Sequence, residues 1–172
     1  KGLFLCGWQL NKNIMLIPKI AKILKDKKIK FHFIITAPKD GSSTHLSFME
    51  KIKFYNVNNM ISIIGTVDKE KLSSLYKQID FVFLLSKLES FSNNIIESWM
   101  FKKILIVSNE PWSKSICKDG AVYVNRDCEL DISNKIIEII KNEKKINEIL
   151  NNVKMILNEY PTIDERTKQE LN

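Results

Sequence analysis

The sequence predicts an α/β fold, a doubly wound parallel sheet of about six strands with helices on both faces. Short apolar segments of strand length alternate along the chain with segments whose apolar residues recur at helical spacing. A helix between successive strands makes those strands parallel and the crossovers right-handed. With 172 residues, of which 44% are hydrophobic, the chain is long enough for one domain with a substantial core.

Six apolar segments are expected to form the strands, and they span residues 3–7, 31–36, 60–65, 81–85, 104–107 and 121–124. The first helix is predicted from apolar residues at helical spacing, beginning at Ile14 and ending near Leu24. Thr44 is expected to cap the second helix and Asp68 the third. Pro111 suits the first turn of a short helix before the last strand.

From Asp131 onward the chain is helical in pattern, with a break or a solvated face expected over residues 141–145. We therefore expect one domain over residues 1–158 and a polar C-terminal tail over residues 159–172. Lys1 begins almost directly on an apolar strand, without an initiator Met or a signal peptide. This pattern favours a segment cut from a longer protein.

Composition narrows the class of protein. No apolar run approaches 18 residues, so no membrane span is predicted. Three cysteines without metal-ligand spacing are typical of reduced thiols in a cytoplasmic protein. The net charge of +7 is almost all lysine, because Arg126 and Arg166 are the only arginines. Nucleic-acid binders more often show arginine forks and clustered aromatics. Attraction to anionic lipid at the inner face of the membrane, or to a phosphorylated acceptor, stays open.

Polar residues gather where the strand over residues 81–85 ends, and the rest of the chain is organised around this point. Glu89 lies in the loop that follows, and Glu97 lies one turn inside the next helical segment. Ligands of open α/β sheets bind outside the carboxyl ends of the strands. A helix start suits a phosphate, and a carboxylate one turn further in suits a sugar diol. The alternative is that both glutamates are solvated surface charges.

The segment over residues 89–97 resembles the donor-binding signature of retaining glycosyltransferases of family 4, which have the GT-B fold. That signature is Glu, seven residues, Glu, usually written E-G-F-G-x-x-x-x-E, and here Ser90 and Ser92 stand in place of its two glycines. Residues 64–86 resemble the family's run G-x-V-x-x-x-x-L-x-x-x-Y-x-x-A-D-x-x-x-x-P-S, and residues 101–125 are similar to the segment that closes the donor site. In all, residues 4–141 align with the family's C-terminal domain.

The resemblance implies an enzyme that moves a hexose from a UDP- or GDP-linked sugar to a glycan or lipid-linked acceptor, without a cofactor or a bound metal. An N-terminal domain would bring the acceptor. Glu89 would be the catalytic residue beside the donor sugar, and Glu97 would hold the ribose hydroxyls. Lys12 and the start of the helix would bind the diphosphate, and the residues at that helix start are Ser90, Phe91, Ser92, Asn93 and Asn94. Thr66 and Val67 would lie near the base.

Trp8 stands where the family has an arginine that binds the diphosphate. This change and the two serines slightly favour a second hypothesis, a related module that binds nucleotides without turnover. A third hypothesis is a receiver-like signalling domain of similar element order. That chemistry requires acidic residues after the first strand, and residues 7–12 contain none.

Overall fold

The structure, a computed structural model, describes residues 1–89 and 92–159. Over these residues the chain forms a six-stranded sheet in the order β3-β2-β1-β4-β5-β6, and every neighbouring pair is parallel. The predicted α/β fold and parallel sheet are therefore confirmed. The strands are β1 (Gly2–Phe4), β2 (Phe33–Ile35), β3 (Ile61–Ile63), β4 (Phe81–Leu84), β5 (Ile104–Ser108) and β6 (Val122–Val124).

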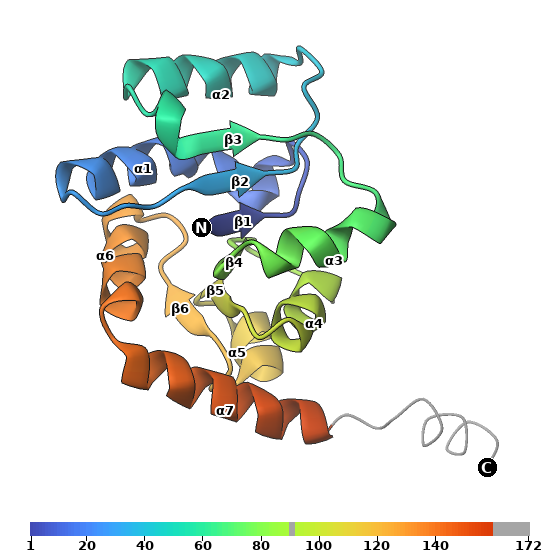
Figure 1. Cartoon of the computed structure of the whole chain (residues 1–172). Helices are drawn as coiled ribbons and strands as arrows, with labels where there is room; N and C mark the ends of the chain where they lie inside the picture. The colour runs from blue at the N-terminus through green and yellow to red at the C-terminus, as the bar shows by residue number, and fades with distance from the viewer. Residues whose placement is uncertain (90–91, 160–172) are drawn as a thin grey trace.

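Helices cover both faces of the sheet (Figure 1). On one face α1 packs against α2 and α6, and on the other α4 packs against β4, β5 and α7. The helices are α1 (Ile17–Asp26), α2 (Ser43–Phe54), α3 (Lys69–Lys77), α4 (Asn93–Met100), α5 (Pro111–Cys117), α6 (Glu129–Ile140) and α7 (Glu143–Glu159). The break expected over residues 141–145 lies between α6 and α7, and α5 begins at Pro111 as predicted.

An aromatic cluster fills the core beside the central strands. The rings of Phe4 on β1 and Phe83 on β4 stack with their centroids 4.7 Å apart, and Phe33 on β2 lies 5.7 Å from Phe83. Gly2 begins β1 next to this cluster, and a Cβ atom there would lie 2.4 Å from a ring carbon of Phe83. The close packing of β1 on the cluster therefore requires glycine at this position.

The first helix begins later than the sequence predicts. Helical spacing placed its start at Ile14, but α1 begins at Ile17, after two short 3-10 turns, η1 (Leu10–Lys12) and η2 (Ile14–Leu16). Asn13 between the turns adopts a left-handed backbone with φ 59°, which a regular α-helix cannot include. Ile14 is still buried, so its position in the pattern of apolar residues reflects burial in the core and not membership of the helix.

Two predicted helix starts are also corrected. The N-cap of α2 is Ser42 rather than Thr44, and its hydroxyl accepts a hydrogen bond from the His45 N–H at 3.3 Å. The last helical region begins at Glu129 instead of Asp131. The Asp131 carboxylate accepts from the Asn125 N–H at 2.7 Å and so closes the loop before the helix.

Asp68 occupies the N-cap position of α3 as predicted, but its side chain makes no capping bond and pairs with Lys71 at 2.8 Å. The predicted C-terminal tail lies outside the described residues from position 160 onward. Within residues 1–89 and 92–159, no helix combines the length and the apolar character that a bilayer crossing requires.

Candidate functional site at the carboxyl edge of the sheet

The order of the strands reverses between β1 and β4, where the two chain exits lead to opposite faces of the sheet. Such a switch point opens a crevice outside the carboxyl ends of the strands, and ligands of open α/β sheets bind there. The side-chain amide of Asn94, in the first turn of α4, donates to the Leu5 carbonyl at the exit of β1, at 3.2 Å. This bond joins the start of α4 to the other wall of the crevice.

An ion pair crosses the crevice. Lys12 in η1, beyond β1, donates from Nζ to Oε1 of Glu89, beyond β4. The side chains are 23% and 13% exposed, so water and salt screen their interaction less than that of a surface pair. The structure thus brings together the predicted diphosphate cation and the predicted catalytic carboxylate, and each neutralises the other.

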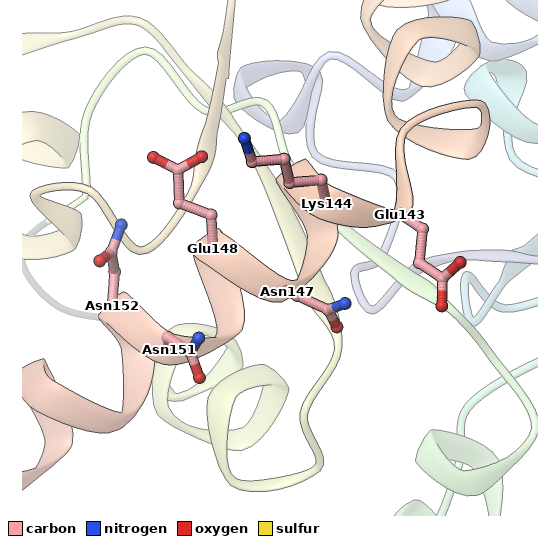
Figure 2. Close-up of a pocket in the computed structure, with 6 residues that line it drawn as sticks. All are labelled: Glu143, Lys144, Asn147, Glu148, Asn151 and Asn152. Carbon is pink, nitrogen blue, oxygen red and sulfur yellow. The ribbon is translucent and has the colours of Figure 1, made fainter.

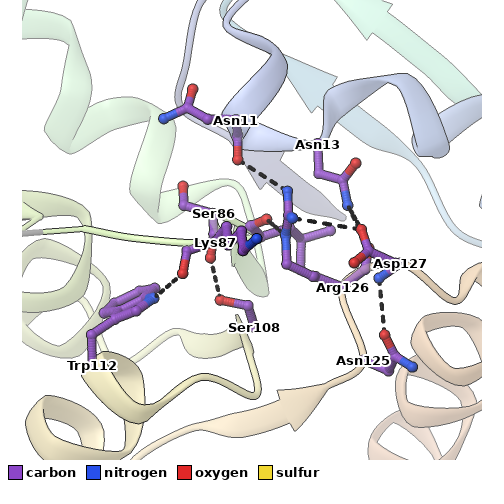
Figure 3. A network of polar contacts seen from close by, with 10 residues as sticks. Asn11, Asn13, Ser86, Lys87, Ser108, Trp112, Asn125, Arg126 and Asp127 are labelled. Carbon is purple, nitrogen blue, oxygen red and sulfur yellow. Dashed lines mark hydrogen bonds and ion pairs between the residues drawn. The ribbon is translucent and has the colours of Figure 1, made fainter.

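Three side chains from other elements fix the segment that carries Glu89 (Figure 3). Arg126 Nε donates to the Leu85 carbonyl at 2.9 Å. Ser108 Oγ donates to the Ser86 carbonyl at 2.5 Å, and Trp112 Nε1 donates to the Lys87 carbonyl at 3.0 Å. Side chains from β5, α5 and the loop before α6 therefore bind three successive carbonyls after β4. These bonds fix the crevice wall up to Lys87.

Glu97 lies on α4 and accepts a hydrogen bond from the Tyr76 hydroxyl of α3 at 2.9 Å. The Tyr76 ring is buried and stacks on Phe101 with a centroid distance of 5.0 Å. Burial, and secondarily the hydrogen bond to Glu97, raises the pKa of Tyr76, so the phenol stays protonated and remains a donor. A carboxylate has about four acceptor sites. The bond from Tyr76 therefore orients Glu97 without exhausting its capacity to accept.

The other predicted site residues are placed less closely together. Ser92 is the N-cap residue of α4 but makes no side-chain capping bond, and Asn93 begins the helix with an exposed side chain. Ser90 and Phe91 lie outside the described residues. Thr66 and Val67 follow β3, which β2 separates from β1, so they share the carboxyl edge but lie to one side of the switch point.

Trp8 is a packing residue in this structure. Its indole N–H donates to the Pro38 carbonyl at 2.6 Å, and its ring stacks on His45 at 5.2 Å and contacts Phe48 at 5.3 Å. These contacts tie the exit of β1 to the loop after β2 and to α2. The position that the family resemblance assigns to a diphosphate-binding arginine therefore serves the fold.

Sequence analysis missed three contributors to this edge: the Tyr76 hydroxyl, Ser108 and Arg126. The helical spacing of Tyr76 with Leu72 and Leu75 predicts only a core residue, whereas the structure shows that its hydroxyl contacts Glu97. One feature of the sequence could have drawn attention to Arg126, because it is one of only two arginines in the chain. Its partner Asn11 is 115 positions away, and no local pattern encodes that contact.

A hollow on another part of the surface, along α7, gathers no comparable set. Figure 2 shows a hollow along α7 whose side chains come from a single helix and point in several directions, so they do not converge on a ligand. Within the described parts of the chain, no group of three or more His, Cys, Asp or Glu side chains is arranged to hold a metal ion.

A six-stranded parallel sheet with a crevice between β1 and β4 is the Rossmann-like fold of one half of a GT-B glycosyltransferase. Sucrose-phosphate synthase from Thermosynechococcus elongatus matches with a TM-score of 0.77 and 15% identity over 91% of this chain and 40% of its own. The C-terminal domain of LpcC, a group 1 family glycosyl transferase from Francisella tularensis, matches with a TM-score of 0.75 and 19% identity over 95% of this chain and 84% of its own. These similarities establish the fold.

A third solved structure, Anabaena HepE in complex with UDP and glucose, has a TM-score of 0.73 and 16% identity over 90% of this chain and 42% of its own. The family model of the group 1 glycosyl transferases matches residues 4–155. The chain therefore belongs to the group 1 glycosyl transferase family. No curated protein sequence matches it significantly. The chain spans about two-fifths of the length of sucrose-phosphate synthase, which it resembles in fold.

Proposed function

We propose that this chain is the donor-binding domain of a retaining glycosyltransferase, which moves a hexose from a UDP- or GDP-linked sugar to a glycan or lipid-linked acceptor. Membership of the group 1 family supports glycosyl transfer. The observation that carries the proposal is the pairing of Lys12 with Glu89 across the crevice. A cation for a diphosphate and a carboxylate for a sugar thus meet at the switch point of the sheet.

In this proposal the donor lies along the carboxyl edge. Glu97, oriented by the Tyr76 hydroxyl, accepts hydrogen bonds from the two ribose hydroxyls. The base lies against the backbone of Thr66 and Val67. The diphosphate binds at the start of α4, because a helix N-terminus presents backbone N–H groups and a partial positive charge to an anion. Ser90 and Phe91 belong to this proposed contact through the signature alone.

Lys12 changes partner when the donor binds. The diphosphate oxygens replace the Glu89 carboxylate as the acceptors of the Lys12 ammonium. Glu89 is then free to face the hexose, where its negative charge stabilises the positive charge that develops at the anomeric carbon. Lys12 and the helix start stabilise the negative charge on the departing diphosphate. The reaction is proposed to need no metal ion, so chelation with EDTA should leave donor binding unchanged.

The acceptor side of the reaction is proposed to lie on a second domain. The solved sucrose-phosphate synthase and HepE chains are more than twice as long as the part that this chain matches. The net charge of +7 is compatible with a peripheral position at the inner, anionic face of a membrane, where a lipid-linked acceptor would be found.

A second candidate is a nucleotide-binding module without turnover. The packing of Trp8 against His45 favours it, because this aromatic ring replaces a cation of the family's site. The two candidates share donor binding and differ in transfer.

Thermal shift against nucleoside diphosphates and their sugars tests the shared step. A ligand at 100 times its Kd stabilises the folded state by about 2.7 kcal/mol, so one base should raise the melting temperature clearly above the others. Stabilisation by no nucleotide in the panel would contradict both candidates. If a nucleotide binds, glycosyl transfer by the chain together with its acceptor domain separates the enzyme from the module.

A further inference from the structure

Arg126 lies in the loop between β6 and α6, but its guanidinium reaches the switch point between β1 and β4 (Figure 3). Nε donates to the Leu85 carbonyl at 2.9 Å, and one terminal nitrogen donates to the Asn11 carbonyl at 3.3 Å. Leu85 begins the segment that carries Glu89, and Asn11 directly precedes Lys12. The guanidinium thus bridges the two walls that the Lys12–Glu89 ion pair also joins.

The side chain is held in place before any ligand binds. It is 13% exposed, and the Asn13 side-chain amide donates to the Arg126 backbone carbonyl. The N–H of Asp127 donates to the Asn125 side chain at 3.1 Å, which closes the loop. A guanidinium fixed in this way loses little conformational entropy when it binds an anion.

Part of the guanidinium is not committed to the fold. It has five N–H donors, and the two described hydrogen bonds go to Leu85 and Asn11. Its NH1 nitrogen lies 3.6 Å from Asp127, a carboxylate whose side chain is 72% exposed. An ion pair so exposed is weak, and an incoming anion can replace it.

Ser86 is a second group of interest at this edge. Ser86 is fully buried, and its hydroxyl forms no hydrogen bond with the part of the chain that the structure describes. Ser86 directly follows Leu85, whose carbonyl holds Arg126. Buried hydroxyls are nearly always hydrogen-bonded in native proteins, so this hydroxyl calls for a partner beyond the described residues.

We propose that Arg126 is the second cation that binds the donor diphosphate and so takes the role that Trp8 does not perform. This inference rests on the proposed function. A nucleoside diphosphate carries more negative charge than Lys12 neutralises alone, and Lys12 is shared with Glu89. A planar guanidinium contacts two phosphate oxygens at once, which an ammonium does not. The second cation of the site would thus be supplied by the loop between β6 and α6.

Isothermal calorimetry with inorganic pyrophosphate, a nucleoside diphosphate and the matching nucleoside tests this assignment. Arg126→Gln should weaken binding of pyrophosphate and of the diphosphate roughly 10- to 100-fold, as expected for loss of charged hydrogen bonds, and leave the nucleoside unchanged. Asp127→Asn should tighten pyrophosphate binding about threefold, because Arg126 loses a competing carboxylate. Lys154→Gln, a matched loss of one exposed positive charge on α7, should change none of the three affinities.

A double-mutant cycle distinguishes direct contact from positioning of Lys12. If Arg126 binds phosphate itself, Arg126→Gln should still weaken pyrophosphate binding severalfold in a Lys12→Met background. The proposal is overturned if Arg126→Gln has no effect in the Lys12→Met background. It is also overturned if Arg126→Gln leaves the preference for diphosphate over nucleoside unchanged.

The remaining outcomes also decide. If Arg126→Gln fails to fold, the Asp127→Asn variant decides, because it leaves the bonds from Arg126 to Leu85 and Asn11 intact. An unchanged affinity of Asp127→Asn for pyrophosphate would then overturn the proposal. Failure of the proposed function is distinct, since the unaltered chain would then bind no nucleotide.

Discussion

At the scale of the residue, the two carboxylates of the crevice have partners of different kinds. Glu97 accepts from the neutral Tyr76 hydroxyl, a bond that is compatible with further hydrogen bonds from a diol. Glu89 pairs with the Lys12 ammonium, an interaction that a diphosphate must disrupt. Under the proposed function, Glu97 can therefore bind in the ligand-free chain, whereas Glu89 would act only after Lys12 has moved to the diphosphate.

The role of Glu97 predicts that Glu97→Gln weakens nucleotide binding by roughly 10- to 100-fold. Hydrogen bonds to a charged group contribute about 1.5–3 kcal/mol, and about 1.4 kcal/mol corresponds to one decade of affinity. Calorimetry measures the loss, and the melting temperature should change little because Glu97 is half-buried. Tyr76→Phe is the control, since it removes the orienting hydroxyl and keeps the carboxylate, and it should weaken binding only a few-fold. Full affinity in Glu97→Gln would return this residue to the solvated surface.

The Lys12–Glu89 pair predicts that the substitution Glu89→Gln has opposite effects on diphosphate binding and on sugar transfer. Glu89→Gln should tighten pyrophosphate binding about three- to tenfold, because the ammonium of Lys12 loses a competing charge. The same variant should abolish transfer by the complete enzyme, since the amide cannot stabilise positive charge at the anomeric carbon. Lys12→Met should weaken pyrophosphate binding. Weaker pyrophosphate binding by Glu89→Gln would show that the pair supports the site instead of competing with the ligand.

At the scale of the element, the segment after β4 depends on side chains from β5 and α5. Ser108 bonds the Ser86 carbonyl inside the protein, and Trp112 bonds the Lys87 carbonyl where water reaches it. The family signature has glycines at the positions of Ser90 and Ser92. The crevice wall up to Lys87 is set by these side-chain bonds, and it does not depend on those glycines.

The two bonds predict unequal losses of stability. Ser108→Ala leaves a buried carbonyl without this donor and should cost about 1–3 kcal/mol in the free energy of unfolding. Trp112→Phe removes a bond at an exposed position where water replaces the donor, so its hydrogen-bonding loss should be at most about 1 kcal/mol. Urea denaturation of both variants measures the difference. Equal losses would show that the Ser86 carbonyl finds another donor when Ser108 is removed.

The strands could be predicted from sequence because each is a short apolar run bounded by polar residues, and all six fall within the expected segments or one residue beyond them. The start of α1 could not be predicted, because Ile14 keeps the helical spacing of apolar residues only through its burial. The left-handed backbone of Asn13 prevents a regular helix from including that position. For the candidate site, the signature predicts Glu89 and Glu97, and the resemblance at the exit of the first strand predicts Lys12. Arg126 and the Tyr76 hydroxyl were missed, because their contacts depend on how distant segments pack.

At the scale of the whole molecule, the candidate site lies at one edge of the sheet, where the Lys12–Glu89 ion pair joins η1 to the segment after β4. In GT-B enzymes, as the family resemblance implies, a second domain faces this edge. Binding and transfer would therefore make different demands on the chain, because the proposed contacts to base, ribose and phosphate all belong to this one domain.

The last prediction is that this chain alone binds donor but does not transfer sugar. Transfer requires the acceptor hydroxyl to be held about 3–3.5 Å from the anomeric carbon, and half a cleft leaves that carbon exposed to water. Affinity for UDP or GDP should be weak, on the order of 10 μM to 1 mM, because a one-sided site buries less of the ligand than a closed one. NMR shifts of the amides around Glu89 and Glu97 on titration with each nucleotide would measure it. Shifts with neither nucleotide would count against the donor site, and steady transfer by the purified 172-residue chain would show that it needs no second domain.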